Sequence, residues 1–304
     1  MSFELVLFTI VTASTPFLIA ALGELVAERA GVLNLGVEGM MAMGAACGFA
    51  AAITFDSNLV GVICGVLAGM VTSAIFAVAV LGFAANQVGS GLALTIFGLG
   101  VSGMIGNRFV GLKRPQIGPI EIPFLSDIPF IGQPFFAQDI FVYLSFILTI
   151  FMGWYLSRTR TGLMLRAVGE NHTSAQALGL PVRRVRLGAV LFGGACAGLA
   201  GVYLSLVYTG FWSANMTASK GWIAILLVVF AAWRPGRLII GAYIFGAASV
   251  LQLHAQAAQF GIPSQVLTSV PYVVTIVALV ILAWRHGRNA GGPGSLGTPY
   301  ISDR

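Results

Sequence analysis

Long stretches without any charged residue restrict the fold of this chain more than any other feature of its sequence. Two of them, 57–107 and 238–284, are long enough for a pair of membrane crossings each, and shorter ones cover 5–23, 140–157 and 187–219. Only 9% of the 304 residues are charged, against about 25% in soluble domains. A helix that crosses a bilayer needs about 20 mostly apolar residues and satisfies its own backbone hydrogen bonds. The sequence therefore predicts a helical integral membrane protein. It excludes a soluble domain, a disordered chain and, with three Cys, a disulfide-stabilised scaffold.

The apolar segments divide into nine predicted helices. Turn-forming sequences at 86–91 and 261–264 split the two longest charge-free runs. Glycines interrupt 31–44, and glycines with polar residues interrupt 210–221; such breaks often mark a transport pathway, although glycines also allow close helix packing. We therefore expect an all-α, polytopic transmembrane helical bundle of about nine helices (eight to ten), with broken or re-entrant segments. The predicted helices cover 3–22, 32–53, 59–82, 88–107, 139–157, 187–208, 217–233, 237–257 and 266–284.

The basic residues predict which side of the membrane each end faces. With the C-terminus in the cytoplasm, 12 Lys and Arg lie inside and four outside, and the opposite orientation reverses these numbers. Nine crossings then place the N-terminus outside. We expect a transmembrane permease domain over 1–286 and a disordered cytoplasmic tail over 287–304, because the tail is polar and rich in Gly and Pro.

Motifs for nucleotide hydrolysis and metal binding are missing from the sequence. Neither Lys follows a Gly, so the Gly-Lys-Ser/Thr of a P-loop is absent, and the three His are far apart. We therefore predict no enzyme activity, no catalytic residue, no metal and no cofactor. The segment 100–103 (GVSG) has the form of the nucleophile site of intramembrane serine proteases, with Ser102 as nucleophile and His254 as its base. With 39 Gly such a match also arises by chance, so a protease is a remote alternative.

The loop 158–186 contains a short predicted helix between two groups of arginines. Asn171 is a favourable N-cap residue, residues 172–178 can form two turns, and Gly179 suits the position that follows a helix. Ala175 and Leu178 are three residues apart and share one side of such a helix. Basic inner loops attract anionic lipid, whereas a capped, near-neutral helix suits the docking of a protein. The residues alone leave both interpretations open.

Ordered motifs along most of the chain resemble one transporter family. Residues 165–171 (LRAVGEN), followed by Ala175, Ala177 and Gly179, are similar to the coupling segment of ABC importer permeases of the branched-chain amino acid, simple sugar and nucleoside group. Three further motifs resemble its nucleoside (Bmp-type) branch: 28–41 (ERAGVLNLGVEGMM), 86–94 (NQVGSGLAL), and 221–224 (GWIA) with Trp233, Pro235, Gly241 and Phe245. The length matches the shorter of the two permeases of that branch. His172 departs from the pattern, which often has Pro there.

The resemblance implies partners and a location. A separate ABC ATPase subunit would receive the coupling segment, and a second permease subunit, a different and longer one, would pair with this chain. An extracytoplasmic substrate-binding protein would deliver the substrate. The resemblance also implies a multi-pass protein of the bacterial cytoplasmic (inner) membrane, surrounded by lipid, with its C-terminus in the cytoplasm and no nucleic-acid partner. The expected ATPase-coupling residues are Gly169, Glu170, Asn171, Ala175, Leu178 and Gly179.

Polar residues inside apolar segments are candidates for the substrate pathway, because they are costly in a membrane unless they face a cavity or a partner. Glu38 has two interpretations: it lines or gates the pathway, or it pairs with Arg29 or caps a broken helix. His254 is either a packed histidine or a substrate ligand. The pathway candidates are Asn34, Glu38, Asn86, Gln87, Gln252 and His254.

These observations together predict the permease subunit of an ABC importer that carries a nucleoside or a related small polar solute by alternating access. A simple sugar or riboflavin is an alternative substrate. An ion-gradient secondary transporter is an alternative mechanism, in which Glu38 would be the essential carboxylate.

Overall fold

The computed structural model of this chain describes residues 3–121, 123, 126, 128, 132–257, 263, 265–267, 269–270, 272–274, 276–277, 280 and 292–300. Within this part of the chain, 7 helices are long and apolar enough to cross a membrane. They are α1 (Phe3–Arg29), α2 (Val37–Thr54), α3 (Asn58–Ala77), α4 (Gln87–Gly106), α6 (Ile140–Arg158), α9 (Val182–Val202) and α11 (Pro235–Ala257). Three of them continue into short turns of another helical type: α3 into η1 (Val78–Gly82), α4 into η2 (Asn107–Phe109) and α9 into η3 (Tyr203–Tyr208).

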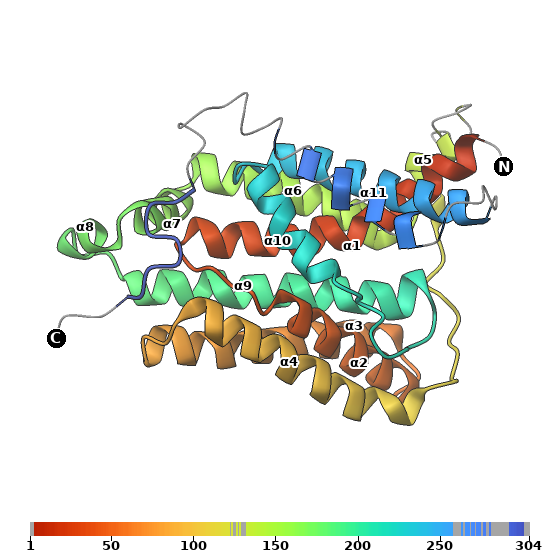
Figure 1. The fold of residues 1–304 in the computed structure, drawn as a ribbon, viewed down its shortest axis with the longest axis horizontal. Coiled ribbons are helices and arrows are strands. Elements are labelled where there is room, and N and C mark those ends of the chain that lie inside the picture. The colour runs from red at the N-terminus through yellow and green to blue at the C-terminus, as the bar shows by residue number, and fades with distance from the viewer. Residues whose placement is uncertain are drawn as a thin grey trace.

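Shorter elements connect or complete the long helices. The helices are α5 (Gly132–Phe136), α7 (Arg160–Glu170), α8 (His172–Ala177) and α10 (Lys220–Phe230). The strands β1 (Ile120–Glu121) and β2 (Ala137–Gln138) pair antiparallel, with Ile120 opposite Gln138. The long helices run along the long axis of the molecule, with α7, α8 and the C-terminus at one end and the N-terminus and α5 at the other (Figure 1). We call these the α8 end and the α5 end.

The predicted all-α membrane bundle is confirmed, with several helix ends that differ from the prediction and one unpredicted helix, α7, inside the predicted loop 158–186. Helix α1 continues seven residues past the predicted end at residue 22, to Arg29. The predicted helix 217–233 is only the 11-residue α10, which starts inside the bundle after an irregular segment at 209–219. Nine of the 19 residues of the ninth predicted helix, 266–284, lie outside the described residues, and the ten that are described are helical. The predicted breaks at 31–44 and 210–221 are thus the places where α2 and α10 begin.

Glycines bring three helices into backbone contact. Helices α2, α3 and α9 pack against one another through Gly44, Gly65, Gly69 and Gly198, which we call the glycine seam. A Cβ built on Gly65 would lie 2.7 Å from the carbonyl oxygen of Gly44, and one built on Gly198 would lie 2.5 Å from that of Gly65. Small residues are typical of tight helix contacts in membranes. The seam therefore holds α2, α3 and α9 together as one closely packed unit of the bundle.

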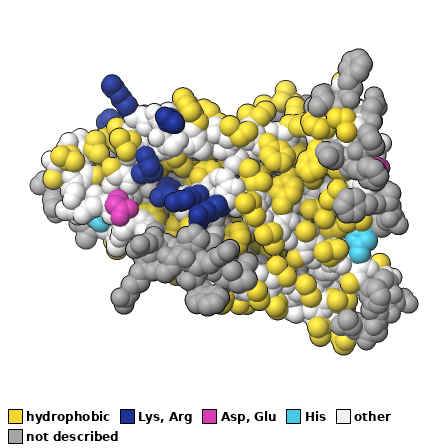
Figure 2. Space-filling model, turned by 90° about the horizontal axis from the view of Figure 1, so that it is seen from above, with side chains coloured by type: hydrophobic (Ala, Val, Ile, Leu, Met, Phe, Trp, Pro, Cys, Tyr) yellow, Lys and Arg dark blue, Asp and Glu magenta, His cyan; other side chains and the backbone are white. Residues whose placement is uncertain are grey.

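The surface is apolar along the bundle and basic at one end. Large apolar side chains are exposed on α3, α4 and α6, as expected for a surface covered by lipid or by another membrane subunit. On the face in Figure 2, the Lys and Arg side chains gather toward the α8 end, while hydrophobic side chains cover much of the rest. Exposed examples are Leu59, Leu67, Val71, Ile96, Met104, Ile147, Ile150 and Trp154.

Candidate functional site

The two helices that begin inside the bundle are joined by Glu38. Its Oε1 accepts a hydrogen bond from the Ser219 backbone N (3.1 Å), and its Oε2 accepts one from the Gly221 backbone N (2.6 Å). The first N–H groups of a helix have no partner within that helix and carry a partial positive charge. The buried Glu38 carboxylate therefore caps the start of α10. The alternative pair with Arg29 is not formed, because that guanidinium donates to the Trp233 carbonyl (2.8 and 3.0 Å).

Gly221 permits this contact. A Cβ added at Gly221 would lie 2.5 Å from Cα of Glu38 and 2.5 Å from its backbone N. Only glycine leaves room for the first turns of α2 and α10 to approach so closely. The sequence therefore places a glycine where two broken helices meet.

Two further buried carboxylates escaped the sequence analysis. Glu24 accepts a hydrogen bond from the Asn34 backbone N (3.0 Å), and Glu28 accepts one from Trp233 Nε1 (2.5 Å). Both side chains are buried. They were overlooked because the first predicted helix ended at residue 22. The run 24–30 (ELVAERA) contains mostly good helix formers, a signal that favoured a longer helix.

Three of the predicted pathway residues hold backbone in place. The Asn34 side chain accepts from the Gly36 backbone N (2.9 Å), and its Nδ2 lies 3.5 Å from Met40 Sδ. Gln87 accepts from the Leu33 backbone N (2.7 Å). Asn86 caps α4 by accepting from the Gly89 backbone N (2.9 Å). Asn34 and Gln87 therefore fix the connection between α1 and α2, with both side chains buried.

The fifth candidate, Gln252, lines a cavity of about 310 Å³ between α1, η3, α10 and α11. Proteins bind small molecules in cavities of about 300–1,000 Å³ that are mostly apolar with a few polar groups. Here the polar side chains include Lys220, Ser249 and Gln252, and the aromatic ones are Phe17, Tyr208, Phe245 and Tyr272. Phe245 packs edge-to-face on Phe17 (centroids 4.9 Å apart) and on Tyr272 (6.3 Å). Lys220, one of the four basic residues that the charge distribution placed outside, thus lies beside this cavity.

The sixth candidate, His254, lies two residues further along α11. Its Nδ1 is 2.8 Å from the Val250 carbonyl oxygen of the same helix. Ser102, the nucleophile of the protease alternative, donates its hydroxyl proton to the Leu99 carbonyl within α4 (2.9 Å). The described part of the chain contains no group of three or more His, Cys, Asp or Glu that could hold a metal ion.

The predicted short helix is present as α8 at the α8 end. Asn171 caps it by accepting from the Ser174 backbone N (2.9 Å). Gly179 follows with φ +76°, the left-handed conformation that favours glycine. Ala175 is buried, whereas Leu178, the C-cap residue that follows α8, is 80% exposed. Leu178 is left at the tip of the loop.

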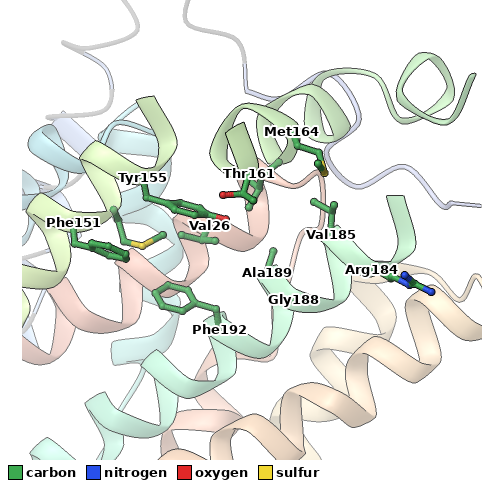
Figure 3. A pocket seen from close by; sticks show the side chains of 12 residues that line it. Val26, Phe151, Tyr155, Thr161, Met164, Arg184, Val185, Gly188, Ala189 and Phe192 are labelled. Atoms are coloured by element: carbon green, nitrogen blue, oxygen red, sulfur yellow. The ribbon is translucent and has the colours of Figure 1, made fainter. Parts of the chain in front are cut away.

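The two remaining coupling candidates lie at the end of α7. Gly169 packs on the backbone of Arg29, and Glu170 is exposed next to it. Helix α7 also borders a second cavity, of about 430 Å³, between α1, α6 and α9. Figure 3 shows its mainly apolar lining, with Phe151, Tyr155 and Phe192 on one side and Met164 and Val185 on the other. Unfilled apolar space therefore lies directly beside α7.

The end of the chain returns to this region. Composition predicts a disordered tail over 287–304; residues 292–300 instead follow a defined path across the α8 end, and the other tail residues lie outside the described part. We call 292–300 the C-terminal strap. The Ser295 backbone N donates to the Gly169 carbonyl (2.9 Å). Ser295 and Tyr300 are both buried, which composition alone does not reveal.

Comparison with known proteins identifies relatives along nearly the whole chain. A putative glucose ABC transporter permease of Haloferax volcanii is 38% identical over 291 residues, which cover 88% of each chain. A guanosine ABC transporter permease of Bacillus subtilis is 31% identical and covers 96% of this chain and 94% of its own. A nucleoside ABC transporter permease of Lactococcus lactis is 29% identical and covers 99% and 98%.

A family of membrane transport proteins also matches the chain. Its description is "branched-chain amino acid transport system / permease component", and the match covers residues 6–283. This range includes the helices α2 and α10 that meet at Glu38, the capped helix α8, and the cavity beside Gln252, which we call the aromatic cavity. The chain therefore belongs to this family of ABC transporter permeases.

Proposed function

We propose that this chain forms the translocation pathway of an ABC importer for nucleosides. The observation that carries the choice of substrate is the cavity at the start of α10, which combines aromatic walls with three long or hydroxylated polar side chains. Relatives named as guanosine and nucleoside permeases match 96% and 99% of this chain. They support the same class of substrate.

The cavity residues suit the two halves of a nucleoside. A nucleobase stacks on aromatic side chains such as Phe17 and Tyr272, a contact that is worth about 1–3 kcal/mol per base. Gln252 offers an amide that both donates and accepts at a base edge. Ser249 donates its own proton to the Phe245 carbonyl (3.0 Å), so its oxygen is free to accept from a ribose hydroxyl. The Lys220 ammonium donates to Met216 O (3.3 Å) and keeps two further protons for the substrate.

The contacts at Glu38 suit a transporter that works by alternating access. In our proposal a separate ATPase subunit docks on α8 and hydrolyses the ATP. Docking moves α8 and α7, and the cavity beside α7 gives that helix space to move. The carboxylate of Glu38 ties α2 to α10, so a tilt of α2 changes the position of Lys220 at the edge of the substrate cavity. Breaking these Glu38 contacts and forming others would then release the substrate.

The proposal also assigns sides and partners. We place the α8 end in the cytoplasm, because Arg29 and the arginines of 158–186 lie there. The C-terminus is then cytoplasmic. A second, longer permease subunit would cover part of the exposed apolar surface of α3, α4 and α6, with lipid on the rest, and an extracytoplasmic binding protein would dock at the α5 end.

The test is uptake by the assembled transporter in liposomes, with tritiated guanosine as substrate. Gln252→Ala is expected to raise KM about tenfold, the equivalent of one lost hydrogen bond to the substrate, with little change in the maximal rate. Asn107→Ala, an exposed amide at the end of α4, is the matched control. An unchanged KM in Gln252→Ala refutes this substrate site. ATP-independent uptake by the permease alone refutes the ABC mechanism in favour of a secondary transporter.

A sugar is the second candidate substrate, favoured by the putative glucose permease that is 38% identical. A hexose such as glucose offers several hydroxyl groups and no aromatic base. Replacing Phe17 by Leu would then alter uptake little, whereas loss of a stacking wall should weaken guanosine uptake. Competition by unlabelled glucose against guanosine distinguishes the two substrates.

A further inference from the structure

Helix α8 is too small to hold its own position. It has six residues, and only Ala175 is buried. Helices shorter than about 12 residues are marginal in water and depend on tertiary contacts. An element that must transmit force from another subunit therefore needs a firm support. In this structure the support comes from the C-terminal strap.

The strap is attached to both ends of the α7–α8 connection. The Ser295 backbone N donates to the Gly169 carbonyl at the end of α7 (2.9 Å). At the start of α8, the His172 backbone N donates to Ser295 Oγ (3.1 Å), and His172 Nδ1 lies 3.0 Å from the same oxygen. One serine thus holds the last turn of α7 and the first turn of α8 together. The buried ring of Tyr300 packs with Ala175, Val168 and Val182 beneath α8.

The same strap also contacts the break between α1 and α2. Gln87 accepts from Leu33 N in that break, and its Nε2 donates to the Thr298 carbonyl of the strap (3.1 Å). The Arg186 guanidinium lies over the Tyr300 ring, 5.7 Å from its centre, while its Nε donates to the Ala30 carbonyl (3.1 Å). The strap therefore lies between α8 and the residues that lead into α2.

Internal hydrogen bonds make the strap a compact element. The Leu296 N donates to the Pro293 carbonyl (2.9 Å), and the Thr298 N donates to the Ser295 carbonyl (3.1 Å). Gly297 has φ +75°. Two overlapping turns therefore give residues 293–298 a defined arrangement, and the buried Tyr300 follows two residues later.

From these contacts we propose that the C-terminal strap connects α8, which docks the ATPase, to the junction of α2 and α10 at Glu38, which we call the gate. Ser295 and Tyr300 are the positioning residues. The strap keeps α8 in place for the ATPase and passes its displacement, through Gln87 and Arg186, to the α1–α2 break and thus to Glu38. The inference rests on the proposed function, because it assumes that an ATPase moves α8. It assigns a role in transport to a segment outside the membrane helices.

The first experiment measures hydrogen–deuterium exchange in the solubilised permease without any ATPase. The backbone N–H groups of Ser295, Leu296 and Thr298 are hydrogen-bonded and are expected to exchange slowly. Tyr300→Ala should speed their exchange, and that of α8, about tenfold, because one cation–π contact and one packed ring are lost. Tyr300→Phe keeps the ring and should exchange at the wild-type rate. Unchanged exchange of α8 in Tyr300→Ala overturns the proposal.

The second experiment measures guanosine uptake per ATP hydrolysed in the complete transporter. Tyr300→Ala should lower this ratio about fivefold or more at an unchanged rate of ATP hydrolysis. Without the packed Tyr300 ring, the movement of α8 no longer reaches the gate. Tyr300→Phe keeps the ring and should leave the ratio at its wild-type value. An unchanged or increased ratio in Tyr300→Ala overturns the positioning role. An absence of guanosine uptake in the wild type refutes the proposed substrate instead, while the exchange of α8 still decides whether the strap supports it.

A disulfide between the strap and α8 distinguishes a strap that positions α8 from one that inhibits transport. In a background without Cys47, Cys64 and Cys196, the pair His172→Cys and Ser295→Cys replaces two side chains that are in contact. Oxidation ties the strap to α8. A positioning strap keeps coupled uptake when it is tied, and loss of uptake on oxidation that reduction restores refutes the proposal.

Discussion

Removal of the Glu38 carboxylate tests whether this residue holds two broken helices together. Glu38→Ala leaves the Ser219 and Gly221 backbone N–H groups without their acceptor, in a place where the carboxylate itself is only 4% exposed. Each buried donor that loses its partner costs about 1–3 kcal/mol. Loss of a negative charge at a helix start costs a further 0.3–1 kcal/mol or so. We therefore expect a loss of about 3–5 kcal/mol in the free energy of unfolding.

The measurement is thermal unfolding of the purified permease in detergent, followed by the reaction of a thiol-specific dye with the buried Cys196. A loss of 1 kcal/mol lowers the Tm of a chain of 304 residues by roughly 1.6 °C, because the entropy of unfolding is about 2.1 cal/mol/K per residue. Glu38→Ala should therefore lower Tm by roughly 5–8 °C. Glu38→Gln keeps one acceptor oxygen and should lose about half as much. Glu121→Ala, at an exposed glutamate of β1, is the matched control.

The outcome also bears on transport. If Glu38 is only a structural cap, Glu38→Gln at low temperature transports at a normal rate once folded. If the cap also transmits movement from α2 to α10, uptake falls more than the folded fraction does. A Tm of Glu38→Ala within 1 °C or so of the wild type, below the shift expected from even one unsatisfied donor, refutes the cap.

Three other predictions concern single positions. Gly221→Ala should lower Tm by several degrees, about 1–3 kcal/mol in stability, because the new Cβ would lie 2.5 Å from Cα of Glu38; an unchanged Tm contradicts the close contact. Leu178→Asp should leave Tm unchanged but weaken binding of the ATPase about tenfold in a pull-down titration, since this side chain is 80% exposed; undiminished binding excludes Leu178 from the interface. Burial and the nearby Arg186 guanidinium lower the pKa of His172 below its usual value of 6.5. A lowered pKa means that the folded strap prefers the neutral imidazole, which faces Ser295, Arg186 and Tyr300. The contact is then complete above about pH 6.5 and is lost as the pH falls through the lowered pKa. The rate of hydrogen–deuterium exchange of the backbone N–H groups in 292–300, corrected for the intrinsic effect of pH, should therefore increase on acidification. His172→Gln should remove this dependence on pH.

The helices were predictable because the bilayer imposes a simple rule on composition. Charge-free runs of sufficient length form helices whatever their partners are. The membrane helices that the structure describes therefore followed from the sequence apart from their ends, whereas the charged helix α7 did not. The two ends of α8 were also predictable, because they depend on local contacts. Asn171 marks its start and Gly179 follows its end, and both act within a few residues of chain.

Contacts between distant segments were not predictable. Glu38 caps a helix that begins more than 180 residues later in the chain, and no local pattern indicates that partner. Asn34 and Gln87 are predicted pathway residues because they are polar within apolar segments, and no local pattern indicated that their side chains hydrogen-bond to backbone groups at the break. The C-terminal strap was missed because Gly and Pro are as common in tight turns as in disordered chains. The buried Ser295 and Tyr300 distinguish the two cases only in three dimensions.

The glycine seam has a mechanical consequence. Helices whose backbones touch resist sliding past one another, so we expect α2, α3 and α9 to move as a single rigid lever. Together α9 and η3 contain 27 residues and are about 40 Å long at 1.5 Å per residue. A tilt of only about 5° at the end held by Arg186 would carry the far end at Tyr208, on the wall of the aromatic cavity, through about 3.5 Å. A small displacement at the arginine-rich end is thereby amplified into one comparable with the thickness of an aromatic ring.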